Sequence, residues 1–175
     1  MGTVAWRLGV AWMLAFAAVH VYWGFGGTAL LPEGVSVLDS LAMFVIDLVA
    51  IPLCLAGALL AWLLRPDQRR GRLVGRRWLT WPGTVGAAVM LVHGVSGLAF
   101  ALLPWLGAGD VPAQERWSLL YEPWWLLGGL LMAATVRGYR VSVRRSQSLQ
   151  RKRREASAVA AAAQTASTSH SPTRA

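Results

Sequence analysis

The chain has 175 residues, of which 55% are hydrophobic and 14% are charged, and its formal net charge is +9. Soluble domains carry roughly a quarter charged residues, so this composition argues against a soluble globular protein. A basic face would suit nucleic-acid binding, but the basic residues form two blocks, 65–77 and 137–154, each beside a long apolar run. That distribution is typical of membrane topology signals, so we expect no nucleic-acid partner.

The first apolar run covers residues 5–25, and a helix needs about 20 such residues to cross a bilayer core. It closes with the stretch HVYWGFGG, residues 20–27, in which Trp23 suits the membrane interface and the glycines favour a tight exit into a loop. A cleaved signal peptide with a small-residue site at 15–17 is the alternative. We disfavour it because Arg7 is the one basic residue of the n-region, and the apolar run continues past the site.

Three further apolar runs are long enough to span a bilayer, at residues 40–64, 81–103 and 117–136. With the first run they predict an all-α membrane protein, a bundle of four transmembrane helices. We place this four-helix domain at residues 1–143 and a tail at 144–175.

The charges of the connections predict the orientation of the bundle. Acidic residues dominate the first and third connections, whereas the second connection and the segment after the fourth run are basic. The basic residues are Arg65, Arg69, Arg70, Arg72, Arg76, Arg77, Arg137, Arg140, Arg144, Arg145, Arg151, Lys152, Arg153 and Arg154. Positive charge stays on the cytoplasmic side of a membrane, so both termini should be cytoplasmic in a multi-pass protein of the inner cell membrane.

The tail has two parts. Its basic stretch RRSQSLQRKRRE can extend the fourth helix and attract anionic lipids of the bilayer, at about 1 kcal/mol per charge. The alternative is a topology signal with no further role. From Ala156 onward the chain is Ala, Ser, Thr and Gln with few large apolar residues, so we expect this cytoplasmic segment to be mostly disordered.

Each predicted transmembrane helix carries one ionisable residue: His20, Asp47, His93 and Glu122. An Asp near the centre of a membrane helix costs about 2.5 to 3.5 kcal/mol, so such residues normally face the bundle and find partners. Small residues on the same side of its helix suggest that His93 points inward. The four residues therefore form the candidate polar site within the membrane.

Distances along the helices sharpen this hypothesis. His20 and Asp47 each lie roughly 10 Å below the outer ends of their helices, which predicts a hydrogen bond or ion pair between these two side chains. His93 should lie about 6 to 8 Å deeper, which argues against a haem held by both histidines and against one zinc site for all four residues. The single cysteine, Cys54, allows no intramolecular disulfide, and we expect no metal site. The sequence specifies neither a cofactor nor a catalytic residue.

Each candidate also has a structural interpretation. His20 and Asp47 could pair only to fix helix register, and His93 could bond a backbone carbonyl. Glu122 precedes a proline, so it could cap the fourth helix. Aromatic residues that line the site or mark the interface are Trp23, Tyr121, Trp124 and Trp125.

The element His20-x-x-Trp23-x-x-Gly26-Gly27 and the stretch YEPWWLLGGLLMAA of the fourth run resemble the small membrane proteins of domain-of-unknown-function family 3995. The resemblance covers about residues 6–139 and excludes the tail. It implies a four-helix bacterial inner-membrane protein that retains its first helix, and it supplies no activity.

Two functions therefore stand as hypotheses. In the first, His20, Asp47 and His93, joined by Glu122, form a small binding or proton and acid–base site near the outer leaflet. In the second, the protein is a structural or accessory membrane protein whose polar residues only fix helix packing, and a membrane-protein partner meets its glycine-rich faces or basic inner surface. Whether the protein is an enzyme stays open.

Overall fold

The computed structural model describes residues 2–65, 76–103 and 118–168 of the chain. Within these ranges the structure is helical and contains no β-strand, as the sequence predicts. The helices are α1 (Gly2–Gly24), α2 (Leu41–Leu63), α3 (Thr80–Leu102) and α4 (Ser118–Thr168), with short 3-10 helices η1 (Val37–Asp39) and η3 (Arg76–Leu79). The first three helices begin and end within three residues of the predicted runs.

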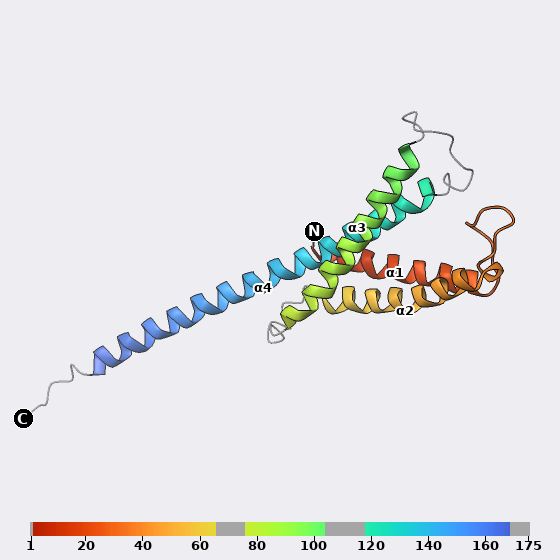
Figure 1. Cartoon of the computed structure of the whole chain (residues 1–175). Coiled ribbons are helices and arrows are strands. Elements are labelled where there is room, and N and C mark those ends of the chain that lie inside the picture. The colour runs from red at the N-terminus through yellow and green to blue at the C-terminus, as the bar shows by residue number, and fades with distance from the viewer. Residues whose placement is uncertain (1, 66–75, 104–117, 169–175) are drawn as a thin grey trace, which may run out of the picture.

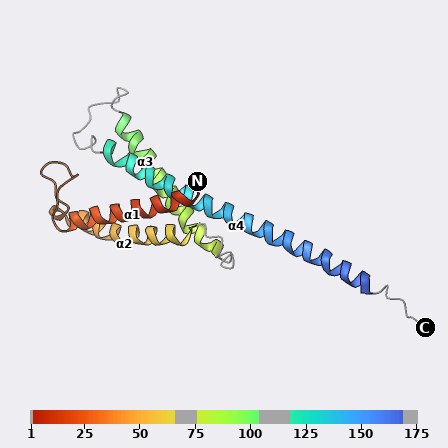
Figure 2. The ribbon, with the colours of Figure 1, turned by 180° about the vertical axis from the view of Figure 1, so that it is seen from behind.

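The helices form two antiparallel hairpins, α1 with α2 and α3 with α4, which join where α1 packs on α4 (Figure 1). We call the end of the bundle with residues 25–40 the hairpin end, and the end from which α4 runs on the tail end. Among the described residues, α2 meets α3 chiefly at the tail end, where Leu60 of α2 and Leu64 just after it approach Gly83 of α3. The spatial order of the helices is therefore α2, α1, α4, α3, and Figure 2 shows it from behind.

The core at the centre of the bundle combines large residues of α1 with small residues of its neighbours. Its buried members are Trp12, Met13, Phe16, Ala17, Cys54, Ala58, Ala61, Ala87, Met90 and Met132. A Cβ atom on Gly128 of α4 would collide with the Trp12 ring and the Met90 side chain. Small residues let helices approach closely where no aqueous hydrophobic effect drives them together, and dispersion contacts then stabilise the pairing.

Helix α1 ends in the stretch singled out in the sequence. Gly26 has a φ of +88°, its N–H donates to the Trp23 carbonyl at 2.9 Å, and the N–H of Gly27 donates to the Tyr22 carbonyl at 3.0 Å. These two bonds and the left-handed residue define a Schellman motif, which satisfies carbonyls that the helix end leaves without partners. The Tyr22 ring occupies the place of any side chain at Gly27. The predicted tight exit is confirmed.

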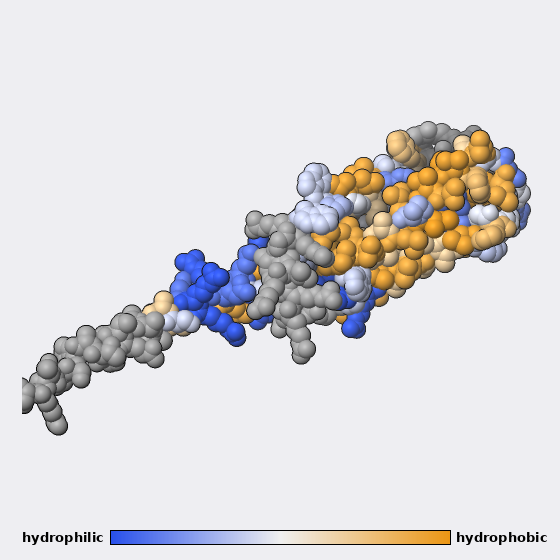
Figure 3. Space-filling view, turned by 90° about the horizontal axis from the view of Figure 1, so that it is seen from below, coloured by the Kyte–Doolittle hydropathy of each residue, from blue (hydrophilic) through white to orange (hydrophobic). Residues whose placement is uncertain are grey.

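Among the described residues, three helices are long and apolar enough to cross a membrane: α2, α3 and the segment Val4–Gly24 of α1. Apolar residues cover most of the bundle surface in Figure 3, and hydrophilic residues gather at the hairpin end and on α4 past the bundle. Helix α4 is not among the three candidates, although the sequence predicts a fourth span. The first turns of α4 contain Glu122 and Pro123, and the helix becomes basic from Arg137.

Helix α4 continues through the basic segment and ends at Thr168. The structure thus differs from the disorder predicted from Ala156. Alanine has the highest intrinsic helix propensity, so a run of alanines can continue an existing helix without burying a large side chain, whereas the prediction weighed burial alone. The predicted arginines at 69, 70 and 72, and the connection 104–117, lie outside the described residues.

Candidate functional site

His20 of α1 and Asp47 of α2 lie side by side between the two helices of the first hairpin. The His20 Nδ1 atom is 2.6 Å from Asp47 Oδ1, and the two side chains are 12% and 4% exposed. The contact follows from the antiparallel hairpin, because both residues lie a similar distance from the loop that joins α1 to α2. The predicted pairing of these two residues is confirmed.

This geometry sets the chemistry of the imidazole. When Asp47 is ionised, Nδ1 carries the hydrogen and donates it to Oδ1, so the free lone pair of a neutral ring is on Nε2. The Nε2 atom is buried and has no hydrogen-bond partner among the described residues. A carboxylate that fixes the tautomer and orientation of a histidine in this way leaves the opposite nitrogen able to act as a base or to accept a hydrogen bond from a ligand.

Aromatic rings enclose His20. Its ring contacts Phe16 at 4.7 Å between centroids and Trp23 at 5.3 Å, in both cases edge to face. Trp23 is itself buried, and its Nε1–H donates to the Ala29 carbonyl at 2.8 Å, which fastens the loop to the end of α1. The Trp23 ring also meets Tyr121 of α4 at 6.4 Å. Trp23 therefore lines the site as well as closing the helix end.

The other two candidates form a second pair, between α3 and α4. His93 Nε2 lies 3.8 Å from Glu122 Oε2, and the two side chains are 54% and 11% exposed. The expectation that His93 points into the bundle is wrong, because its side chain is 54% exposed. The α3 face that meets α4 consists of Gly83, Ala87, Met90, Gly94, Gly97 and Ala101. His93 flanks this face instead of lying on it.

Glu122 does not cap α4, because the helix begins at Ser118 and Glu122 lies inside it. The residue is 8% exposed, and its carboxylate occupies the space where Gly97 of α3 lacks a side chain. Its Oε2 atom is buried without a hydrogen-bond partner among the described residues. Glu122 is therefore a buried acid at the helix interface.

Aromatic side chains separate the two pairs. Phe16 contacts Trp125 edge to face at 5.6 Å, and Trp125 contacts the His93 ring at 4.7 Å. Trp124 packs on the Trp12 ring at 5.7 Å. Phe16, one helical turn below His20, therefore contacts the same tryptophan ring as His93.

One shared feature escaped the sequence interpretation. In each hairpin a glycine follows the histidine by four positions, as Gly24 follows His20 and Gly97 follows His93. A Cβ atom on Gly24 would lie 3.4 Å from Asp47 Oδ2, and one on Gly97 would collide with Glu122. Residues four apart share a helix face, so each glycine gives the opposite carboxylate room beside its histidine. The repeated spacing His-x-x-x-Gly was the available signal.

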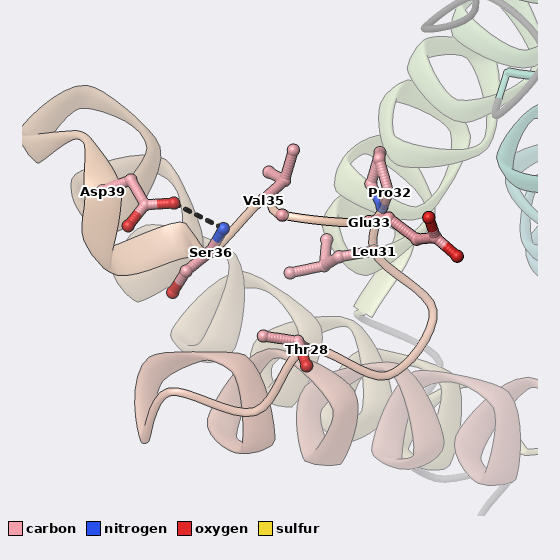
Figure 4. Close-up of a pocket in the computed structure, with 8 residues that line it drawn as sticks. Thr28, Leu31, Pro32, Glu33, Val35, Ser36 and Asp39 are labelled. Atoms are coloured by element: carbon pink, nitrogen blue, oxygen red, sulfur yellow. Dashed lines mark hydrogen bonds between the residues drawn. The ribbon is translucent and has the colours of Figure 1, made fainter.

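The described residues contain no group of three or more His, Cys, Asp or Glu side chains that could hold a metal ion. A surface hollow of about 530 Å³ lies in the loop between α1 and α2, lined by residues 28, 31–36 and 39 (Figure 4). Asp39 turns toward the backbone N–H of Ser36, which donates to it at 2.7 Å as part of a capping box. None of the four candidates lines this hollow.

The model of a family described as "Protein of unknown function (DUF3995)" matches residues 13–132 of the chain. The chain belongs to this family. The DUF3995 match includes both histidine–carboxylate pairs and the Gly26 helix end, and it stops before the basic part of α4. Neither the curated proteins nor the solved structures include a match to the chain.

Proposed function

We propose that this DUF3995 protein is a four-span protein of the inner cell membrane with both termini in the cytoplasm. Support comes from the charge of the chain, since the described basic residues Arg65, Arg137 and Arg140 lie at the tail end of the bundle and Glu33 and Asp39 lie at the hairpin end. At the tail end Arg65 stacks over Trp62 at 4.3 Å and Arg7 over Trp6 at 5.5 Å, pairs that suit a membrane interface.

The orientation is tested with a membrane-impermeant maleimide on intact cells. The native thiol is removed with Cys54→Ala, and a single thiol is introduced as Glu33→Cys or Ser148→Cys, both in described segments. We expect labelling of the first variant in intact cells and of the second only after lysis. The reverse pattern would reject the orientation, and labelling of both in intact cells would reject a fourth span.

We propose that the function of the protein is acid–base binding of a small ligand at His20 near the outer leaflet. The observation that carries this proposal is the 2.6 Å contact between His20 Nδ1 and Asp47 Oδ1, together with the buried Nε2 atom that lacks a partner among the described residues. A buried nitrogen without a partner loses the energy of a hydrogen bond, about 1 to 3 kcal/mol, which a ligand with a donor group would restore. His93 is not part of this proposed site.

The proposed site lies near one side of the membrane, and we see no polar path from it to the other side among the described residues. Below Phe16 the buried residues of the bundle are mainly apolar, with Trp12, Met13, Ala58 and Ala61 among them. The buried hydroxyl of Thr135 donates to the Leu131 carbonyl of its own helix at 2.8 Å. A proton path needs a chain of groups that exchange protons, so this geometry favours ligand binding or local proton transfer over conduction across the bilayer.

The test uses the full chain purified in mild detergent with the imidazole carbons isotopically labelled. We expect NMR to show His20 in the tautomer with hydrogen on Nδ1, and Asp47→Asn to change its tautomer balance. The His93→Gln variant is the matched control and should leave the His20 signal in place. A His20 ring that is protonated on Nε2 alone would contradict the proposal.

The structural alternative predicts a different outcome for the same variants. If His20 and Asp47 only fix helix register, His20→Gln and Asp47→Asn should change thermal stability and nothing else. Mass spectrometry of small molecules that co-purify with the wild-type protein and are lost in both variants would favour the binding function. Identical small-molecule content in all three proteins would favour the structural role.

We also propose that anionic lipids contact the basic part of α4. Arg137 and Arg140 are exposed where α4 leaves the bundle, and Arg140 Nη2 donates to the Thr84 hydroxyl at 2.9 Å, which places this turn beside the start of α3. Flotation with vesicles that contain phosphatidylglycerol should show salt-sensitive binding of a peptide of residues 137–155. Equal binding to neutral vesicles would reject this proposal.

A further inference from the structure

The second histidine–carboxylate pair consists of the same residue types as the first, but its nitrogen–oxygen distance is longer and its imidazole is more exposed. Each pair has a histidine on the first helix of a hairpin, a glycine four positions later and a carboxylate on the second helix. In the first pair the nitrogen–oxygen distance is 2.6 Å and the imidazole is 12% exposed, and in the second they are 3.8 Å and 54%. The His93 imidazole of the second pair is therefore accessible from outside the bundle, and Glu122 Oε2 lies buried behind it without a hydrogen-bond partner among the described residues.

The second pair presents two atoms that can accept hydrogen bonds. Glu122 is an acceptor when ionised, and Nε2 of a neutral His93 ring is an acceptor when the hydrogen is on Nδ1. Two acceptors 3.8 Å apart cannot form a hydrogen bond with each other, but a donor group that reaches both could bond to each of them. A protonated amine has three N–H donors and a charge that complements the carboxylate.

The surroundings indicate how such a group would arrive. His93 is exposed on the outer surface of α3, next to the exposed apolar residues Val89 and Val92, so a ligand would reach it from the lipid. Trp125 lies against the imidazole at 4.7 Å and supplies an aromatic face beside the charge. An exposed imidazole in a bilayer is costly without a polar partner.

We infer that His93, Glu122 and Gly97 form a second binding site, which takes the protonated primary amine of an amphiphile that enters from the bilayer. Glu122 holds the ammonium group, His93 Nε2 accepts one of its hydrogens, and the apolar chain lies along α3. This site is separate from His20 and does not depend on the function proposed there.

The experiment is a protection assay on the full chain in mild detergent. Dicyclohexylcarbodiimide is an apolar reagent whose C=N bond adds the O–H of a protonated carboxyl group, and the acyl group then migrates to nitrogen to leave a stable N-acylurea. Peptide mass spectrometry identifies the modified residue. We expect modification of Glu122 and strong protection by dodecylamine, with far weaker protection by ethylamine and by dodecanol.

Three variants make the result specific. Glu122→Gln should abolish the modification, His93→Gln should keep it and weaken the protection by dodecylamine, and His20→Gln should change neither. Glu33 in the exposed loop is the internal control for reaction outside the membrane. In nanodiscs, protection by phosphatidylethanolamine but not by phosphatidylcholine would assign the amine to a lipid headgroup, and protection by dodecylamine alone would assign it to a free amphiphile.

Two results would overturn the inference. One is a folded protein in which Glu122 is not modified, since the carboxyl group would then be closed to the bilayer. The other is protection that dodecanol gives as well as dodecylamine, or that survives in His93→Gln, since the amine and the imidazole would then have no specific part.

Discussion

The carboxylate of Glu122 lies in the space that a side chain at Gly97 would occupy. Helices α3 and α4 therefore depend on a glycine at this position for their contact and for the place of the acid. The substitution Gly97→Ala should force Glu122 out of its place and lower stability by about 1 to 3 kcal/mol, the usual cost of overpacking.

Thermal unfolding in detergent, followed by loss of monodisperse protein, measures this effect. Gly86→Ala is the matched control, because no atom lies within 4 Å of a Cβ atom on Gly86 and alanine favours the helix. Equal stability of the two alanine variants would show that Glu122 does not occupy the space beside Gly97.

A double-mutant cycle on His20→Gln and Asp47→Asn measures the energy that links this pair. Residues in direct hydrogen-bonded contact show coupling energies of about 0.5 to 3 kcal/mol, so the effects of the two substitutions on unfolding should not add. The control cycle joins Asp47→Asn with His93→Gln, which belong to different pairs, and should be additive. Additivity in the first cycle would mean that the 2.6 Å contact contributes nothing to stability.

Trp23→Phe removes one hydrogen bond and keeps most of the ring contacts. The lost donation from Nε1 to the Ala29 carbonyl should cost about 1 kcal/mol and loosen the loop of residues 25–35. Hydrogen exchange of the backbone amides in this loop should become faster, while exchange in α3 stays unchanged. Trp81→Phe is the control, because Trp81 is 68% exposed. Unchanged exchange in the loop would show that the indole bond does not fasten it.

Removal of residues 156–175 should leave the stability of the bundle unchanged. Side chains from Ala156 to Val159 are exposed, so their loss removes no buried contact. If the helix reaches Thr168 in the membrane-bound protein, circular dichroism of the shortened chain should show the loss of about three and a half helical turns. An unchanged helical signal would instead favour the disorder that the sequence predicts.

The sequence predicted the parts of this structure that depend on local pattern. Apolar length located α1, α2 and α3, and the glycines after Trp23 indicated the helix end that Gly26 forms. The contact of His20 with Asp47 could be predicted because a short loop makes α1 and α2 antiparallel neighbours at matching depth.

The position of His93 could not be predicted in the same way. Helical periodicity shows that His93 is near a small-residue face, but not whether it lies on that face or beside it. The packing of α4 decides this, since Gly94 and Gly97 meet Leu126 and Glu122 and leave His93 at the edge. The pairing of Glu122 with His93 could not be predicted for the same reason, because it also depends on how α4 packs on α3. Side-chain periodicity constrains one helix, whereas a site between helices also needs their relative rotation.

In the spatial order α2, α1, α4, α3 the two helices of each hairpin are neighbours, and the two hairpins meet between α1 and α4. Each half holds its own histidine–carboxylate pair, and the seam between halves is mainly the contact of α1 with α4. The two halves should therefore assemble as separate polypeptides. Co-expressed fragments 1–70 and 71–175 should co-purify, and Gly128→Leu should separate them by obstructing the Trp12 ring. Such a molecule resembles a heterodimer of two helical hairpins that are joined in one polypeptide.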